Sequence, residues 1–97
     1  MGYQDPTTAS STDYTYYASL SADVNCVTAR PGYEHDQKHE KLPRKLVVDS
    51  GGDGNLTIVD RFGHSLTIAI VAPWSMEIGP ASITQATTTV TKLWILW

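Results

Sequence analysis

The chain has 97 residues, a formal net charge of −3 at pH 7 and a sequence pI of about 5.4. At this length we expect one domain whose own core supplies limited stability, because a small domain leaves much of its surface exposed. The negative charge and the lack of a long Lys/Arg run argue against nucleic acid as a partner. No apolar run is long enough to cross a bilayer, and the N-terminus does not resemble a secretory signal, so we expect no membrane partner and synthesis in a cytosol-like compartment.

The first 22 residues are rich in Ser, Thr, Asp and Tyr and predict an extended N-terminal arm (1–22) ahead of a β domain (23–97). The arm has no helical periodicity and too little aliphatic area to offset its own ordering entropy. Tyrosine is enriched where a segment lies against another protein, and the arm carries four: Tyr3, Tyr14, Tyr16 and Tyr17. We expect the arm to become ordered on a neighbour; the alternative is a mobile N-terminus.

The segment that follows is weakly strand-like over residues 23–29 and is broken by Arg30-Pro31-Gly32. Residues 33–43 are almost wholly charged or polar, which predicts a surface loop or at most one helical turn. Cys26 is the single cysteine, so the chain has neither an internal disulfide nor a second thiol for a metal site. We interpret it as a small apolar or half-buried thiol.

The second half of the chain alternates short β-branched runs with glycine-bearing turns, which is typical of an antiparallel β unit. The glycines in 50–54 favour a hairpin between the first two strands, and residues 61–64 predict the next turn. Residues 85–89 are a loop or the start of the final strand. The expected fold is all-β, a small antiparallel β-sandwich or barrel with an extended N-terminal arm. The predicted strands are 45–49, 55–60, 65–71, 76–83 (interrupted at Gly79-Pro80) and 90–97.

The last strand is apolar on both faces. Period two sends Leu93, Ile95 and Trp97 to one side and Trp94 and Leu96 to the other. A strand in a small isolated sheet normally keeps one polar face, and an exposed apolar one promotes aggregation. We therefore predict cover on both sides, from the domain's own core and from another subunit.

Two sets of residues suggest metal binding, and both have simpler explanations. His35 and His39 stand four apart, as in helical zinc sites, but lack a defined third ligand. Asp49 and Asp53 lie in an acidic, glycine-rich stretch that resembles part of a calcium loop but suits a hairpin turn equally. No nucleotide-binding or nucleophile motif is present, so we predict neither an enzyme nor a cofactor.

The order of motifs over residues 46–97 resembles a family of small tailed-phage virion proteins that includes head spike bases and capsid decoration proteins. Residues 32–43 look like an insertion relative to that pattern, and residues 74–77 depart from its Gly-rich turn. The matching motifs are L-V-V-D (46–49), G-G-D-G (51–54), L-T-I-V-D-R-F-G (56–63), L-T-I-A-I-V-A-P (66–73), A-T-T-T-V (86–90) and L-W-I-L-W (93–97).

This resemblance implies a non-enzymatic decoration (cement) or head spike base protein on the capsid surface of a virion, made in the host cytoplasm. Its partners would be the major capsid protein and its own copies, as a homotrimer or alternatively a pentamer. The residues expected at the oligomer or capsid interface are Tyr3, Tyr14, Tyr16, Tyr17, Trp94, Leu96 and Trp97. Two alternatives stay open: a tail, fibre or adhesion module that binds a receptor or glycan, and a small metal-binding protein that uses His35 and His39.

Overall fold

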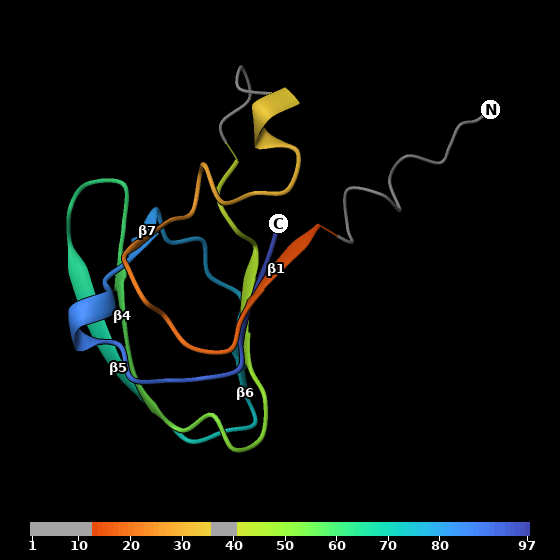
Figure 1. Ribbon diagram of the computed structural model, residues 1–97. Helices are drawn as coiled ribbons and strands as arrows, with labels where there is room; N and C mark the ends of the chain where they lie inside the picture. Colours follow the sequence, from red (N-terminus) through yellow and green to blue (C-terminus); the bar gives the residue numbers. More distant parts are fainter. Residues whose placement is uncertain (1–12, 36–40) are drawn as a thin grey trace.

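The computed structural model describes residues 13–35 and 41–97, which form a β-sandwich of two four-stranded antiparallel sheets (Figure 1). This confirms the all-β sandwich prediction. Sheet I has the order β1-β8-β3-β6, from β1 (Tyr14–Tyr17), β8 (Leu93–Leu96), β3 (Lys45–Val48) and β6 (Trp74–Met76). Sheet II has the order β2-β7-β4-β5, from β2 (Val24–Asn25), β7 (Ser82–Ile83), β4 (Gly54–Val59) and β5 (Ser65–Ile70). Two short 3-10 helices accompany the sheets, η1 (Tyr33–His35) and η2 (Gln85–Thr87).

The core lies between the two sheets and is built by alternate residues of their strands. Burying each such side chain contributes about 1.5–3 kcal/mol, so these residues supply the main force that holds the layers together. Cys26 is fully buried among them, as expected. The buried apolar residues are Val24, Cys26, Leu46, Val48, Leu56, Ile58, Ile70, Ile83, Val90, Leu93, Ile95 and Trp97.

The hairpin between β4 and β5 forms as predicted, with Asn55 opposite Ala69 and Val59 opposite Ser65. Its turn places Gly63 at φ +87°, a left-handed conformation that side chains other than glycine rarely adopt. The Asp60 carboxylate accepts hydrogen bonds from the backbone N–H groups of Phe62 and His64, at 2.8 and 2.9 Å. These bonds stabilise the turn and thereby the register of the hairpin.

The predicted hairpin between β3 and β4 is wrong. β3 pairs with β8 and β6 in sheet I, while β4 belongs to sheet II, so residues 49–53 cross between the layers. Gly52 is buried in this corner, where an added Cβ would lie 2.2 Å from the Thr91 carbonyl oxygen. Glycines permit a corner as readily as a hairpin, and the corner lets the apolar sides of β3 and β4 face each other across one core.

The predicted strand 76–83 is two strands in different sheets. β6 begins earlier, at Trp74, and β7 comprises Ser82 and Ile83 alone. The Gly79-Pro80 interruption was predicted, and it lies in the segment that joins the two layers. The final strand is shorter than predicted, because Lys92 adopts φ +54° and the regular strand begins at Leu93.

Part of the predicted arm belongs to the domain's own sheet. β1 pairs antiparallel with β8, with Tyr14 opposite Leu96 and Tyr17 opposite Leu93. The Trp97 backbone N–H extends this ladder by donating to the Asp13 carbonyl oxygen at 3.0 Å. Residues 14–17 are therefore ordered on the same chain, because β8 offers them a free backbone edge and an apolar surface.

Candidate functional site

The two apolar sides of β8 have different surroundings. Leu93 and Ile95 point into the core and are 1% and 0% exposed, whereas Trp94 and Leu96 lie on the opposite side of sheet I and are only half-buried. The predicted alternation of this strand is confirmed. Sheet II covers its inner side, and its outer side carries two large apolar side chains.

Strand pairing brings three more large side chains to that surface. Tyr14 lies opposite Leu96, and Trp94 lies opposite both Tyr16 and Val47. Directly opposed residues of antiparallel strands share a face, so these five side chains form one apolar patch, hereafter the outer face. Lys45, opposite Leu96, shares this side of the sheet. Tyr14 and Tyr16 are 55% and 43% exposed.

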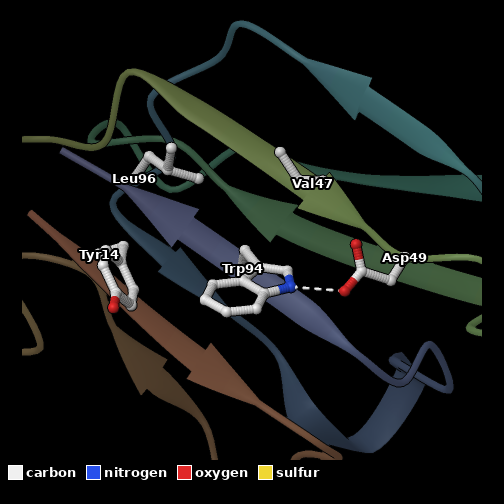
Figure 2. Close-up of a pocket in the computed structure, with 5 residues that line it drawn as sticks. All are labelled: Tyr14, Val47, Asp49, Trp94 and Leu96. Carbon is white, nitrogen blue, oxygen red and sulfur yellow. Dashed lines mark hydrogen bonds between the residues drawn. The ribbon is translucent and has the colours of Figure 1, made fainter. Parts of the chain in front are cut away.

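Trp94 is the centre of the outer face (Figure 2). Its ring centroid lies 5.4 Å from that of Tyr14 and 4.6 Å from that of Tyr16, and both pairs are tilted. Its indole N–H donates a hydrogen bond of 2.8 Å to Asp49 Oδ2. Tilted aromatic contacts and this bond hold the indole in one orientation, so the patch is preorganised.

A shallow groove of about 260 Å³ runs over this patch and is lined by Tyr14, Val47, Asp49, Trp94 and Leu96. Four of the five lining side chains are apolar or aromatic, and the Asp49 carboxylate is the single charged group. Such a surface binds by excluding water from large rings, with one acceptor to orient the ligand. It is suited to packing against another surface.

The predicted interface residues do not all gather here. Tyr14, Tyr16, Trp94 and Leu96 share the outer face, whereas Tyr17 and Trp97 belong to the inner side of sheet I. Tyr3 lies outside the described residues. Sequence reasoning did not assign Val47 or Asp49 to an interface: the alternation of residues 45–49 separates Val47 from its buried neighbours, but it does not indicate that this strand pairs with β8.

Trp97 is part of the core. It is 5% exposed, and its indole N–H donates to the Cys26 carbonyl oxygen at 3.0 Å. Burial in these apolar surroundings raises the pKa of the Cys26 thiol to about 12. Burial also raises the pKa of Tyr17, with a smaller contribution from Cys26. These three residues thus stabilise the interior instead of contributing to the outer face.

The candidate metal ligands are not brought together. Asp49 accepts the Trp94 N–H, and Asp53 Oδ1 accepts the Ala72 backbone N–H at 2.8 Å. His35 is exposed on η1, and His39 lies outside the described residues. Within residues 13–35 and 41–97, no three His, Cys, Asp or Glu side chains are arranged to hold a metal ion.

Comparisons with known proteins give no match, whether with family models, curated proteins or solved structures. In the described part of the chain, no helix has the length and apolar character that crossing a membrane requires. A functional assignment therefore depends on the outer face and on the motif order of residues 46–97.

Proposed function

We propose that the protein is a structural component of a tailed-phage virion, a decoration (cement) or head spike base protein that oligomerises on the capsid and stabilises the head. The observation that carries this proposal is the outer face, where β8 presents Trp94 and Leu96 beside two partly exposed tyrosines. Large aromatic side chains on a rigid sheet are typical of interface cores. The motif order of residues 46–97 supplies the virion context.

The energetics favour a role in which many copies act together. Each large side chain that becomes fully buried at a contact contributes about 1.5–3 kcal/mol before the cost of association. A patch of five side chains therefore supports a modest contact between two proteins. Repetition over a capsid strengthens it, because each bound copy favours the assembled state and linked sites raise the effective concentration.

The test is binding to intact heads of the virus that encodes the protein, with Trp94→Ser as the variant. The wild-type protein should oligomerise and co-sediment with heads in a fixed number of copies, and Trp94→Ser should lose head binding. Met76→Ser is the matched control, because Met76 is a partly exposed apolar residue of sheet I that lies opposite the buried Leu46. A wild-type protein that is monomeric and does not bind heads, or a Trp94→Ser variant that behaves like wild type, would contradict the proposal.

A second candidate function is a tail, fibre or adhesion module that binds a glycan. The observation that favours it is the groove itself, where the partly exposed ring of Tyr14 and the Asp49 carboxylate lie on either side of the Trp94 indole. An aromatic ring packs on the apolar face of a sugar, while a carboxylate accepts hydrogen bonds from its hydroxyl groups. Binding of the purified protein to host cells or glycans, without binding to heads, would support this function over the first.

A further inference from the structure

The free edge of sheet II is a second candidate interaction surface, remote in the fold from the outer face of sheet I. β5 is the terminal strand of its sheet and pairs, among the described residues, with β4 alone. It presents the unbonded side of a six-residue strand. An unpaired edge of this length is a template for another strand unless a charge, a proline or a bulge blocks it.

The hydrogen bonds of β4 show which backbone groups β5 presents at this edge. On the side away from β5, the Asn55 N–H donates to Thr89 Oγ1 and the Asn55 carbonyl oxygen accepts the Thr89 N–H. On the same side, the Thr57 N–H donates to Thr88 Oγ1 and the Thr57 carbonyl oxygen accepts the Thr84 N–H. In an antiparallel ladder, the residue opposite such a position also points its N–H and C=O away from the pair. The residues opposite Asn55, Thr57 and Val59 are Ala69, Thr67 and Ser65, and their N–H and C=O groups therefore point to the free edge.

The side chains of β5 contain none of the features that normally block an edge. The strand S-L-T-I-A-I has no charged residue, proline or glycine. Leu66 is 56% exposed although it lies opposite the buried Ile58. Phe62, just before the strand, and Val71, just after it, are 78% and 77% exposed. Apolar side chains therefore flank this edge at both ends.

We propose that β5 pairs antiparallel with β5 of a second copy of this chain, about a two-fold axis at Thr67. In this register Ser65 lies opposite Ala69 of the second copy, and the outward N–H and C=O groups of both strands find partners. Leu66 lies opposite Ile68 of the second copy, on the side of the sheet that faces the core. The two four-stranded sheets then continue into one sheet of eight strands.

The ends of the strand favour a second copy over an unrelated partner. Antiparallel pairing places the Phe62 end of one strand beside the Val71 end of the other, so the two most exposed large apolar side chains of the described residues are covered together. An uncharged strand meets its own copy without like-charge repulsion. The same surface patch is used twice, as an isologous two-fold contact requires.

The first test compares two substitutions of Ala69 by sedimentation velocity. Ala69→Pro removes an N–H that points to the free edge and so leaves the β4–β5 ladder intact, whereas Ala69→Thr keeps the N–H. Ala69→Pro should weaken self-association by about ten-fold or more, because both copies in the two-fold contact carry the substitution and each loses one inter-chain hydrogen bond. Ala69→Thr should associate like wild type. A wild-type protein without self-association, or equal association of the two variants, would overturn the proposal.

The second test traps the contact and does not depend on how well the proline variant folds. Two Thr67→Cys residues at the axis would have Cα atoms about 5.5 Å apart, within the range of a disulfide. Mild oxidation should give a covalent dimer, and Cys26 does not compete because it is buried. Ser75→Cys, an exposed position on the edge strand β6, is the control and should give no covalent dimer. Equal cross-linking of both variants, or none with Thr67→Cys, would refute the register.

This inference does not depend on the proposed function. The variant Trp94→Ser alters sheet I and should leave the Thr67→Cys cross-link unchanged, whereas Ala69→Pro leaves the outer face as it is. Failure of the wild-type protein to bind heads, together with an intact Thr67→Cys cross-link, would count against the virion proposal alone. Head binding by the wild-type protein without the cross-link would count against the β5 contact alone.

Discussion

Replacing Trp97 by alanine should destabilise the protein far more than replacing Trp94. Trp97 is 5% exposed, so its removal leaves a cavity in the core, which costs about 3–5 kcal/mol for a large aromatic side chain. It also removes the donor to the buried Cys26 carbonyl oxygen, and an orphaned buried acceptor adds about 1–3 kcal/mol. This sum is a large fraction of the 5–15 kcal/mol that holds a typical domain folded.

Trp94→Ala is the matched comparison, because it removes the same side chain from the other side of sheet I. The variant loses two tilted ring contacts and one hydrogen bond at a partly exposed site, for a cost of about 1–2 kcal/mol. Trp97→Phe keeps most of the apolar volume but loses the hydrogen bond to Cys26, so its loss of unfolding free energy should lie between those of Trp97→Ala and Trp94→Ala.

Urea unfolding followed by far-UV circular dichroism measures these differences without relying on tryptophan fluorescence. For a slope of about 1–3 kcal/mol/M, Trp97→Ala should lower the unfolding midpoint by well over 1 M. The slope itself should change little if the denatured state is unaffected. A cost for Trp97→Ala that is no greater than that for Trp94→Ala would refute the assignment of inner and outer sides to sheet I.

Two further predictions concern titratable groups. Cys26 should resist alkylation at neutral pH in the native protein and react once urea unfolds it, because burial raises its pKa from 9.0 to about 12; rapid native labelling, measured by mass spectrometry, would contradict its burial. In the β4–β5 turn, hydrogen bonds from the backbone of His64 and of Phe62 hold the pKa of Asp60 below its ordinary value of 3.8. Because the folded-state pKa is lowered, the carboxylate stabilises the turn above pH 3.8, and this stabilisation is lost as the pH falls through the lower folded value. Asp60→Asn should therefore flatten the acid side of the stability curve relative to wild type, whereas an unchanged acid midpoint would show that these bonds do not matter.

The sequence predicted features that depend on local pattern. The alternation of residues 54–70 identified both strands of the β4–β5 hairpin and its turn, because a short turn leaves adjacent strands little choice of partner. The assignment of alternate β8 side chains to opposite sides of the sheet was also correct, since the period of two in a strand is a property of the backbone. The Tyr-rich composition of residues 14–17 indicated a segment that becomes ordered on a neighbouring protein, whereas the structure pairs it with β8 of the same chain.

The candidate site was only partly predictable. Tyr14, Tyr16, Trp94 and Leu96 were among the expected interface residues, and the structure brings them to one face. Val47 and Asp49 joined that face because β3 pairs with β8, which alternation within either strand does not indicate. Trp97 was grouped with Trp94 by composition, although the alternation placed them on opposite sides.

By itself, the amino-acid sequence determined an all-β chain, the alternation of β8 side chains between the two sides of its sheet, and one hairpin. These features follow from period-two patterning and from turn chemistry over a few residues. Tertiary structure alone decided that residues 49–53 form a corner, that β1 adds to the domain's own sheet, and that β5 is left at an edge. Pairing between distant strands is a competition for one shared core, and its outcome depends on how both sheets pack together. The same competition decided which tryptophan became interior and which remained at the surface.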